Sequence, residues 1–352
     1  QSDEEIRRNL ETMRAGNVCT FRLHTEPWPA RWLDIADEVG VMIVDEAAVY
    51  TDTGSYAYSD HGFWENYRTH LAELVRRDRN HACLALWSLG NEIMFMGNAR
   101  TCPDLEKKLA ELGRFVKGID PHHPVTFEAD LDPGGSYDVI GLHYPWELPN
   151  QHAYPVICDW LGSRVQTEAG GGMLGQRSTG FLWERKKPLY IGEYLWVPVR
   201  DYSAGSVFFG DEAYLNRGEH TDRARVRAWT DQTLAYRRSG VSAMCPWSAF
   251  DFGGRPGKRR GYDEQKEFYR RVAAYLRTRD NRVFAGEKAT LEFDVFNDSA
   301  KTLSLELRLL RAGKTVASAT LVLEPAGYRP VSLAVEAPPV KGRKVFALEA
   351  VL

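Results

Sequence analysis

The sequence predicts an α/β protein whose larger part is an eight-stranded (β/α)8 TIM barrel, followed by a small all-β immunoglobulin-like sandwich. Short apolar runs alternate seven times with amphipathic segments over about 280 residues, the pattern of parallel strands joined by crossover helices. Polar residues follow many of these runs instead of gathering at one point, which favours a closed barrel over an open doubly wound sheet. Near the C-terminus the helical periodicity stops, and apolar residues alternate with polar ones.

The individual elements follow from caps, periodicity and turn residues. Ser2 and the acids after it predict a helix start, with Ile6, Leu10 and Met13 at helical spacing. By the same reasoning, the expected helices cover residues 3–15, 30–39, 63–77, 104–117, 222–238 and 263–277. The expected strands, rich in apolar and β-branched residues, cover residues 18–24, 41–44, 83–87, 125–127, 137–143, 188–192 and 241–247.

Seven strands are one fewer than a barrel needs. Because the chain opens on a helix, the expected first strand would precede residue 1, in a segment or piece outside this chain. Residues 1–279 are assigned to the barrel domain and residues 280–352 to the β-sandwich. The sandwich strands are expected where apolar residues alternate, around 291–295, 303–309, 316–323 and 331–335.

Composition excludes several classes of function. The net charge of −3 argues against nucleic acid or an anionic membrane as the main partner. No apolar run reaches the roughly 20 residues that cross a bilayer. The five cysteines form no CxxC pair or Cys/His cluster, so neither a metal site nor a disulfide framework is predicted. Ten Trp and sixteen Tyr would suit sugar recognition, although most such rings serve packing.

Two glutamates end separate predicted strands. Glu92 follows Gly90-Asn91 after the apolar run 83–87, and Glu193 follows the run 188–192. Taken alone, Asn91 and Glu92 could equally cap the next helix. On a barrel, however, the C-terminal ends of distant strands converge on one face. Two carboxylates that face each other there can hydrolyse a glycosidic bond, with about 5–5.5 Å between them in retaining enzymes.

The block Trp87-Ser88-Leu89-Gly90-Asn91-Glu92, preceded by Arg79-Asn80-His81, closely resembles the acid/base motif of glycoside hydrolase family 2. That family includes β-galactosidases, β-glucuronidases and β-mannosidases. Further blocks that resemble the family occur in the family's order, at residues 34–46, 138–144, 188–194 and 246–247. The resemblance covers residues 1 to about 280, and the C-terminal sandwich is similar to those that follow such barrels.

The resemblance implies a role for each matching residue. Glu92 would be the general acid/base and Glu193 the nucleophile. Asn91 would donate a hydrogen bond to the sugar 2-hydroxyl, Tyr144 would orient Glu193, and Trp247 would form the floor of the sugar subsite. The alternative for the aromatic residues is packing, and for Asn91 a helix cap.

The block at the second strand matches the family less regularly. Arg22 would support the nucleophile electrostatically, with an ordinary structural ion pair as the alternative. His24, which falls one position early, would contact the sugar or else be a satisfied core histidine. His143 is also placed among the substrate-binding residues, and Glu46 either joins them or braces the barrel.

The resemblance implies a retaining exo-β-glycosidase that needs no cofactor and no metal. β-Galactosidase is the first choice by default. β-Glucuronidase or another family 2 activity is the alternative, because the basic run Lys258-Arg259-Arg260 could suit an acidic sugar. The run lacks the asparagine of the family's uronate-binding pair, and its other interpretation is a solvated group of charges. An internally cutting glycosidase and a catalytically silent carbohydrate-binding barrel also remain open. The implied partners are a carbohydrate substrate and either a second copy of the chain or upstream family 2 domains that complete the barrel.

Overall fold

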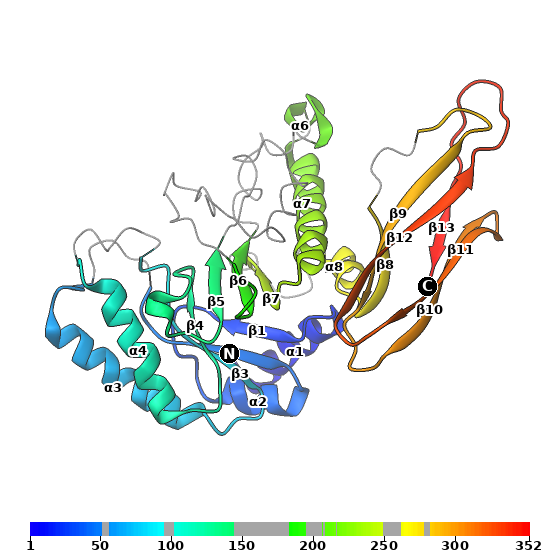
Figure 1. Ribbon diagram of the computed structural model, residues 1–352. Helices are drawn as coiled ribbons and strands as arrows, with labels where there is room; N and C mark the ends of the chain where they lie inside the picture. The colour runs from blue at the N-terminus through cyan, green and yellow to red at the C-terminus, as the bar shows by residue number, and fades with distance from the viewer. Residues whose placement is uncertain are drawn as a thin grey trace. The chain divides into compact units, whose positions relative to one another are not determined.

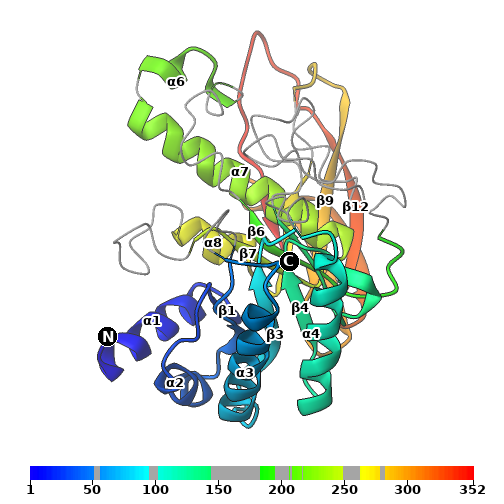
Figure 2. The same cartoon turned by 90° about the vertical axis from the view of Figure 1, so that its left-hand side faces the viewer.

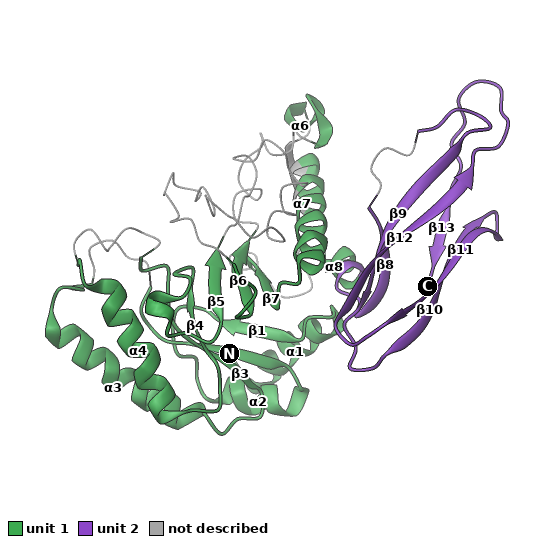
Figure 3. Ribbon diagram, in the orientation of Figure 1, with its two compact units in different colours: residues 1–266 green, residues 267–352 purple. Residues whose placement is uncertain are grey.

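The computed structural model describes residues 1–50, 56–94, 102–143, 183–194, 206–248 apart from 207 and 216, 262–277 and 282–352. Contacts divide the chain into two compact units, residues 1–266 and 267–352, which Figure 3 draws in different colours.

Unit 1 carries parallel strands in two sheets with the orders β1-β2-β3-β4 and β5-β6-β7 (Figure 1). The strands are β1 (Thr20–Leu23), β2 (Met42–Glu46), β3 (Leu84–Asn91), β4 (Val125–Glu128), β5 (Ile140–His143), β6 (Leu189–Tyr194) and β7 (Ala243–Pro246). The two sheets are linked where the amide N–H groups of Asp138 and Val139 donate to Val125 O. Sequence order equals spatial order throughout, and the arrangement is a partial TIM barrel, as predicted.

In the part of unit 1 that the structure describes, α-helices lie before β1 and between β1 and β2, β2 and β3, β3 and β4, and β6 and β7, and a 3-10 turn lies between β4 and β5. The helical elements are α1 (Asp3–Ala15), α2 (Arg31–Val39), α3 (His61–Asp78), α4 (Leu105–Ile119), the 3-10 turn η2 (Pro133–Gly135), α6 (Glu212–Leu215), α7 (Arg217–Ser239) and α8 (Tyr262–Phe268). The side chain of Ser2 accepts from the Glu5 N–H and Glu5 accepts from the Ser2 N–H, a capping box that starts α1 where the sequence predicts. Among the described residues, no helix combines the length and apolar content that crossing a bilayer requires.

The core of unit 1 lies between these helices and the outer face of the strands. One apolar cluster joins α1 and α2 to β1 and β2, and a second joins α3 and α4 to β3 and β4. Figures 1 and 2 both show α3 and α4 side by side against this part of the sheet. A smaller cluster, centred on Val44, Leu86 and Tyr190, fills the space between β2, β3 and β6. Strands held on both faces in this way present only their ends to a ligand.

Those ends carry polar side chains. β2 ends at Glu46, β3 at Asn91, β4 at Glu128 and β5 at His143, while Glu193 is the second-last residue of β6. All five of these residues are buried despite being polar or charged. Because the strands are parallel, their C-terminal ends bring these groups to one end of the barrel.

Unit 2 contains two antiparallel sheets with the orders β12-β9-β8 and β11-β10-β13. Its strands are β8 (Val272–Leu276), β9 (Lys288–Asn297), β10 (Leu303–Arg311), β11 (Lys314–Leu323), β12 (Gly327–Glu336) and β13 (Glu349–Val351). Leucine, valine and phenylalanine side chains from β9, β10, β11 and β12 form one core, so the two sheets pack as the predicted β-sandwich.

The predicted helix over 263–277 is wrong in its second half. Helix α8 stops at Phe268, and Val272–Leu276 is the strand β8, paired antiparallel with β9. The run Val272-Ala-Ala-Tyr-Leu fits either a helix or a strand by periodicity, and the pairing partner decides between them. For this reason the compact units divide at 266/267, upstream of the boundary at 279/280 that the sequence suggests.

Candidate active site

The backbone at the end of β3 places Glu92. Gly90 has φ +140°, and a Cβ there would lie 2.6 Å from Cζ of Phe127, so only glycine fits. Glu92 itself adopts the left-handed region with φ +56°, and its N–H donates to Glu128 O at 2.9 Å. The next described helix, α4, has Asp104 at its N-cap, so neither Asn91 nor Glu92 caps it.

Arg22, on β1, is the centre of the charged network. Its Nε and Nη2 donate to the two oxygens of Glu46 at 2.8 and 3.1 Å. Its Nη1 donates to Glu193 Oε1 at 3.0 Å, and Nη2 also donates to Asn91 Oδ1 at 2.7 Å. Burial alone would lower the pKa of Arg22, but the carboxylates of Glu128, Glu46 and Glu193 outweigh it and raise the pKa well above its usual value. The guanidinium therefore stays charged and fixes three site residues at once.

Glu46 has both carboxylate oxygens occupied by the protein. In addition to Arg22, Ser88 Oγ donates to Oε2 at 2.7 Å and the Thr25 N–H donates to Oε1 at 2.6 Å. Burial would raise the pKa of Glu46, but the charge of Arg22 and the neighbouring His24 hold it well below its usual value. A fully buried, ionised and saturated carboxylate suits a bracing role better than direct contact with a sugar.

His143, at the end of β5, lies between three carboxyl groups. Its Nδ1 is 2.8 Å from Glu92 Oε1 and 3.9 Å from Glu193 Oε1. Its Nε2 is 3.0 Å from Glu128 Oε2. Burial would lower the pKa of this imidazole, but the charge of Glu193 and the hydrogen bonds to Glu128 and Glu92 raise it from 6.5 to about 10. The ring is therefore an imidazolium at neutral pH, and both of its N–H groups have carboxylate acceptors.

The facing atoms of Glu92, His143 and Glu193 all lie within 4.8 Å of one another. Each offers one atom that a metal ion could bind, but an imidazolium has no free lone pair for a metal. This trio is therefore suited to moving and holding protons. Two carboxyl groups so close together fit the short separation that retaining glycosidases need.

His24 and Trp247 are the partly exposed members of the site. Their ring centroids are 4.5 Å apart in an edge-to-face arrangement. His24 Nδ1 lies 3.5 Å from Glu46 Oε1 and 3.8 Å from Glu193 Oε1. His24 thus lies beside Glu193, and Trp247 packs against His24. Tyr144, expected from the sequence to orient Glu193, lies outside the described residues.

Sequence reasoning missed Glu128 and the role of Gly192. Glu128 is fully buried and accepts from His143, although it matches no motif. It does end a predicted strand, as Glu92 and Glu193 do, and that shared position was the signal available. A Cβ on Gly192 would lie 1.7 Å from Glu128 Oε2 and 2.6 Å from His143 Nε2, so glycine makes room for their contact.

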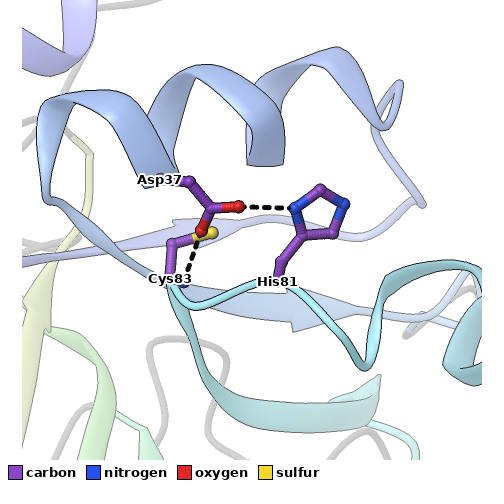
Figure 4. Close-up of side chains that lie close together, drawn as sticks. All are labelled: Asp37, His81 and Cys83. Carbon is purple, nitrogen blue, oxygen red and sulfur yellow. Dashed lines mark hydrogen bonds and ion pairs between the residues drawn. The ribbon is translucent and has the colours of Figure 1, made fainter.

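A second cluster of side chains that offer possible metal-ligand atoms lies where β3 begins (Figure 4) and consists of Asp37, His81 and Cys83. Asp37 Oδ2 is 2.8 Å from His81 Nδ1, and its Oδ1 accepts the Cys83 N–H at 2.6 Å. The Cys83 thiol donates to Leu33 O, and burial raises its pKa. These contacts tie α2 to the segment that leads into β3, so the cluster has a structural use without a ligand.

Paired carboxyl groups at the C-terminal ends of barrel strands are typical of the active site of a glycoside hydrolase. Residues 2–262 match the family model described as "Glycosyl hydrolases family 2, TIM barrel domain". The chain therefore belongs to glycoside hydrolase family 2, as its motifs predicted.

Two relatives identified by sequence are named β-galactosidases. The chain is 26% identical to one from Pectobacterium atrosepticum over 216 residues, which are 55% of this chain and 19% of that protein. It is 24% identical to one from Enterobacter cloacae over 260 residues, which are 72% of this chain and 22% of that protein. The chain thus spans about a fifth of the length of these relatives.

Similar solved structures carry other names. A β-glucuronidase from Bacteroides uniformis superimposes with a TM-score of 0.54 at 13% identity, covering 100% of this chain and 43% of that one. A β-D-mannosidase from Dictyoglomus thermophilum gives a TM-score of 0.56 at 13% identity, covering 97% of this chain and 45% of that one. At such identity these likenesses show the fold.

Proposed function

We propose that this chain is the catalytic part of a retaining exo-β-glycosidase. One observation carries the proposal: the facing atoms of Glu92, Glu193 and the shared neighbour His143 lie within 4.8 Å of one another. A separation this short leaves no room for the second-face water of an inverting enzyme, and it favours direct attack by a carboxylate.

Glu193 is the nucleophile, because Arg22 donates to its Oε1 and holds the carboxylate in place for attack on the anomeric carbon. Glu92 protonates the leaving oxygen in the first step and deprotonates water in the second. Asn91 has its carbonyl oxygen engaged by Arg22, so the amide nitrogen is the group that donates to the sugar 2-hydroxyl. His24 and Trp247 line the subsite beside the nucleophile.

The favoured substrate is a terminal β-galactoside. The sequence relatives at 24–26% identity are named β-galactosidases, whereas the β-glucuronidase and β-mannosidase structures are similar at 13–18% identity. A panel of nitrophenyl β-glycosides tests this choice directly. If the enzyme preferred the glucuronide or the mannoside, the substrate assignment would change and the proposed mechanism would stay the same.

The mechanism is tested by trapping. A 2-fluoro glycoside should inactivate the enzyme and leave a covalent sugar on the peptide that contains Glu193, detected by mass spectrometry. Glu193→Gln should lose turnover with its fold intact, and Glu92→Ala should lose about 10²–10⁴-fold on substrates that need acid assistance. Near-normal activity of Glu193→Gln would reject the assignment. Sugar binding without turnover, in the longest natural form of the protein, would instead indicate a silent carbohydrate-binding barrel.

A further inference from the structure

We propose that His143 and Glu128 form a positioning pair behind the acid/base carboxyl. In this pair Glu128 holds His143 as an imidazolium, and Nδ1–H of His143 occupies Oε1 of Glu92, so that the transferable proton is carried on Oε2. The inference rests on the role of Glu92 in the proposed function and adds two residues to that machinery.

The geometry fixes the ring on both sides. Nδ1 is held by Glu92 at 2.8 Å and Nε2 by Glu128 at 3.0 Å, and the His143 side chain has no exposed surface. Gly192 makes this contact feasible, since a side chain there would occupy the place of the Glu128 carboxylate. A ring with both nitrogens bound to protein carboxylates has no atom left for the substrate. His143 therefore acts through Glu92, in place of the direct sugar contact expected from the sequence.

The charges that face His143 come from four strands. Glu92 follows β3, Glu128 ends β4 and Glu193 lies on β6; Arg22, on β1, opposes them with its Nε 3.6 Å from Glu128 and its Nη1 3.0 Å from Glu193. With Glu92 protonated, the carboxylates of Glu128 and Glu193 still outnumber the single guanidinium, which favours a second cation at the centre. The His143 pKa of about 10 agrees with that balance.

The proton balance needs no other reactant. In the first step Glu193 bonds to the anomeric carbon, the glycosidic C–O bond breaks, and the proton on Oε2 of Glu92 goes to the leaving oxygen. The new negative charge on Glu92 is stabilised by Nδ1–H. In the second step water loses a proton to Oε2 while its oxygen bonds to the anomeric carbon and Glu193 leaves. His143 keeps its own protons throughout.

The test compares His143→Gln and Glu128→Gln with wild type on aryl and alkyl glycosides of increasing leaving-group pKa. Both variants should lose about 10- to 100-fold more kcat/KM on the alkyl glycoside than on the dinitrophenyl glycoside, because only the former needs the proton. His123→Gln is the matched control: His123 also pairs with a carboxylate, Asp120, at 2.7 Å, but outside this network. Its losses should be equal across the series.

A second readout does not depend on turnover. The ¹⁵N resonances of His143 should stay those of an imidazolium through pH 8 in wild type and become neutral at lower pH in Glu128→Gln. Equal losses on all leaving groups in His143→Gln, or a neutral ring at pH 7, would overturn the inference. Glu92→Ala distinguishes a failure of this inference from a failure of the proposed function. If Glu92→Ala also loses activity equally on all leaving groups, Glu92 is not the acid and the proposed function fails. If Glu92→Ala shows the leaving-group dependence and the His143 and Glu128 variants do not, only the positioning pair fails.

Discussion

Nη1 of Arg22 donates to Oε1 of Glu193 at 3.0 Å, although the two positions are 171 residues apart in the sequence. The same guanidinium donates to Glu46 through Nε and Nη2, so one side chain on β1 joins the ends of β2 and β6. Charge-assisted bonds of this kind are directional as well as strong. The strand ends are thereby held at fixed spacing, and the Glu193 carboxylate is held in one orientation.

Replacing Arg22 by Met should cost both stability and activity. The change leaves Glu46 and Glu193 buried without their cation, which typically costs about 3–5 kcal/mol. Urea unfolding should show this as a lower midpoint, and kcat/KM should fall with it. Arg31→Met is the control, because Arg31 bonds to Asp3 at an exposed site and should change little. Equal midpoints for the two variants would contradict the central role of Arg22.

Gly192→Ala should lower both activity and stability, although it adds only one methyl group. The added methyl would lie 1.7 Å from Glu128 Oε2, so the carboxylate must move away from His143. We expect a loss of kcat/KM on poor leaving groups together with a destabilisation of about 1–3 kcal/mol. Gly118→Ala in α4, where a Cβ meets nothing within 4 Å, should instead stabilise by up to about 1 kcal/mol. A Gly192→Ala enzyme with wild-type kinetics would show that the contact is dispensable.

Stability should decrease with alkaline pH because of His143. Its pKa is 6.5 when unperturbed and about 10 in the folded protein, so the folded state binds more protons between these values. The stabilisation is complete below pH 6.5 and is lost as the pH rises through 10, with a slope of up to about 1.4 kcal/mol per unit. Urea unfolding from pH 6 to pH 10 measures this slope. In His143→Gln the slope should be smaller; an unchanged slope would assign the effect to other groups.

Asp37→Ala should destabilise the barrel and spare the chemistry. The carboxylate bonds to His81 and to the Cys83 N–H, and losing both should cost about 1–3 kcal/mol. Activity per folded molecule should stay near wild type, because the cluster lies where β3 begins and the proposed catalytic groups lie where it ends. Asp34→Ala, on the exposed face of α2, provides the comparison in the same unfolding assay. A selective loss of kcat in Asp37→Ala would point to a link between the two ends of β3.

The barrel strands and the family could be predicted because each depends on local sequence. Apolar runs closed by polar residues give the strands, and the block ending at Glu92 identifies the family. Strand β8 could not be predicted in this way, because the run Val272–Leu276 satisfies both periodicities and only its pairing with β9 selects a strand.

The contacts between the site residues also could not be predicted from the sequence. His143 resembles a substrate-binding residue when only its strand position is known. Its carboxylate neighbours come from β3, β4 and β6, at separations of 15 to 51 residues along the chain, and no motif spans them. Glu128 was missed for the same reason: its importance lies in what it faces across the barrel.

The 3.9 Å between His143 Nδ1 and Glu193 Oε1 has a consequence for the reaction cycle. In the proposed cycle, conversion of Glu193 to a glycosyl ester removes its negative charge from this side of the imidazolium, while Glu92, which has given up its proton, gains a negative charge 2.8 Å from Nδ1. The negative charge beside Nδ1 thus moves from Glu193 to Glu92. The ring therefore reports which half of the cycle the enzyme occupies. Its nitrogen chemical shifts would therefore report the fraction of enzyme that carries the covalently bound sugar, without any label on the sugar.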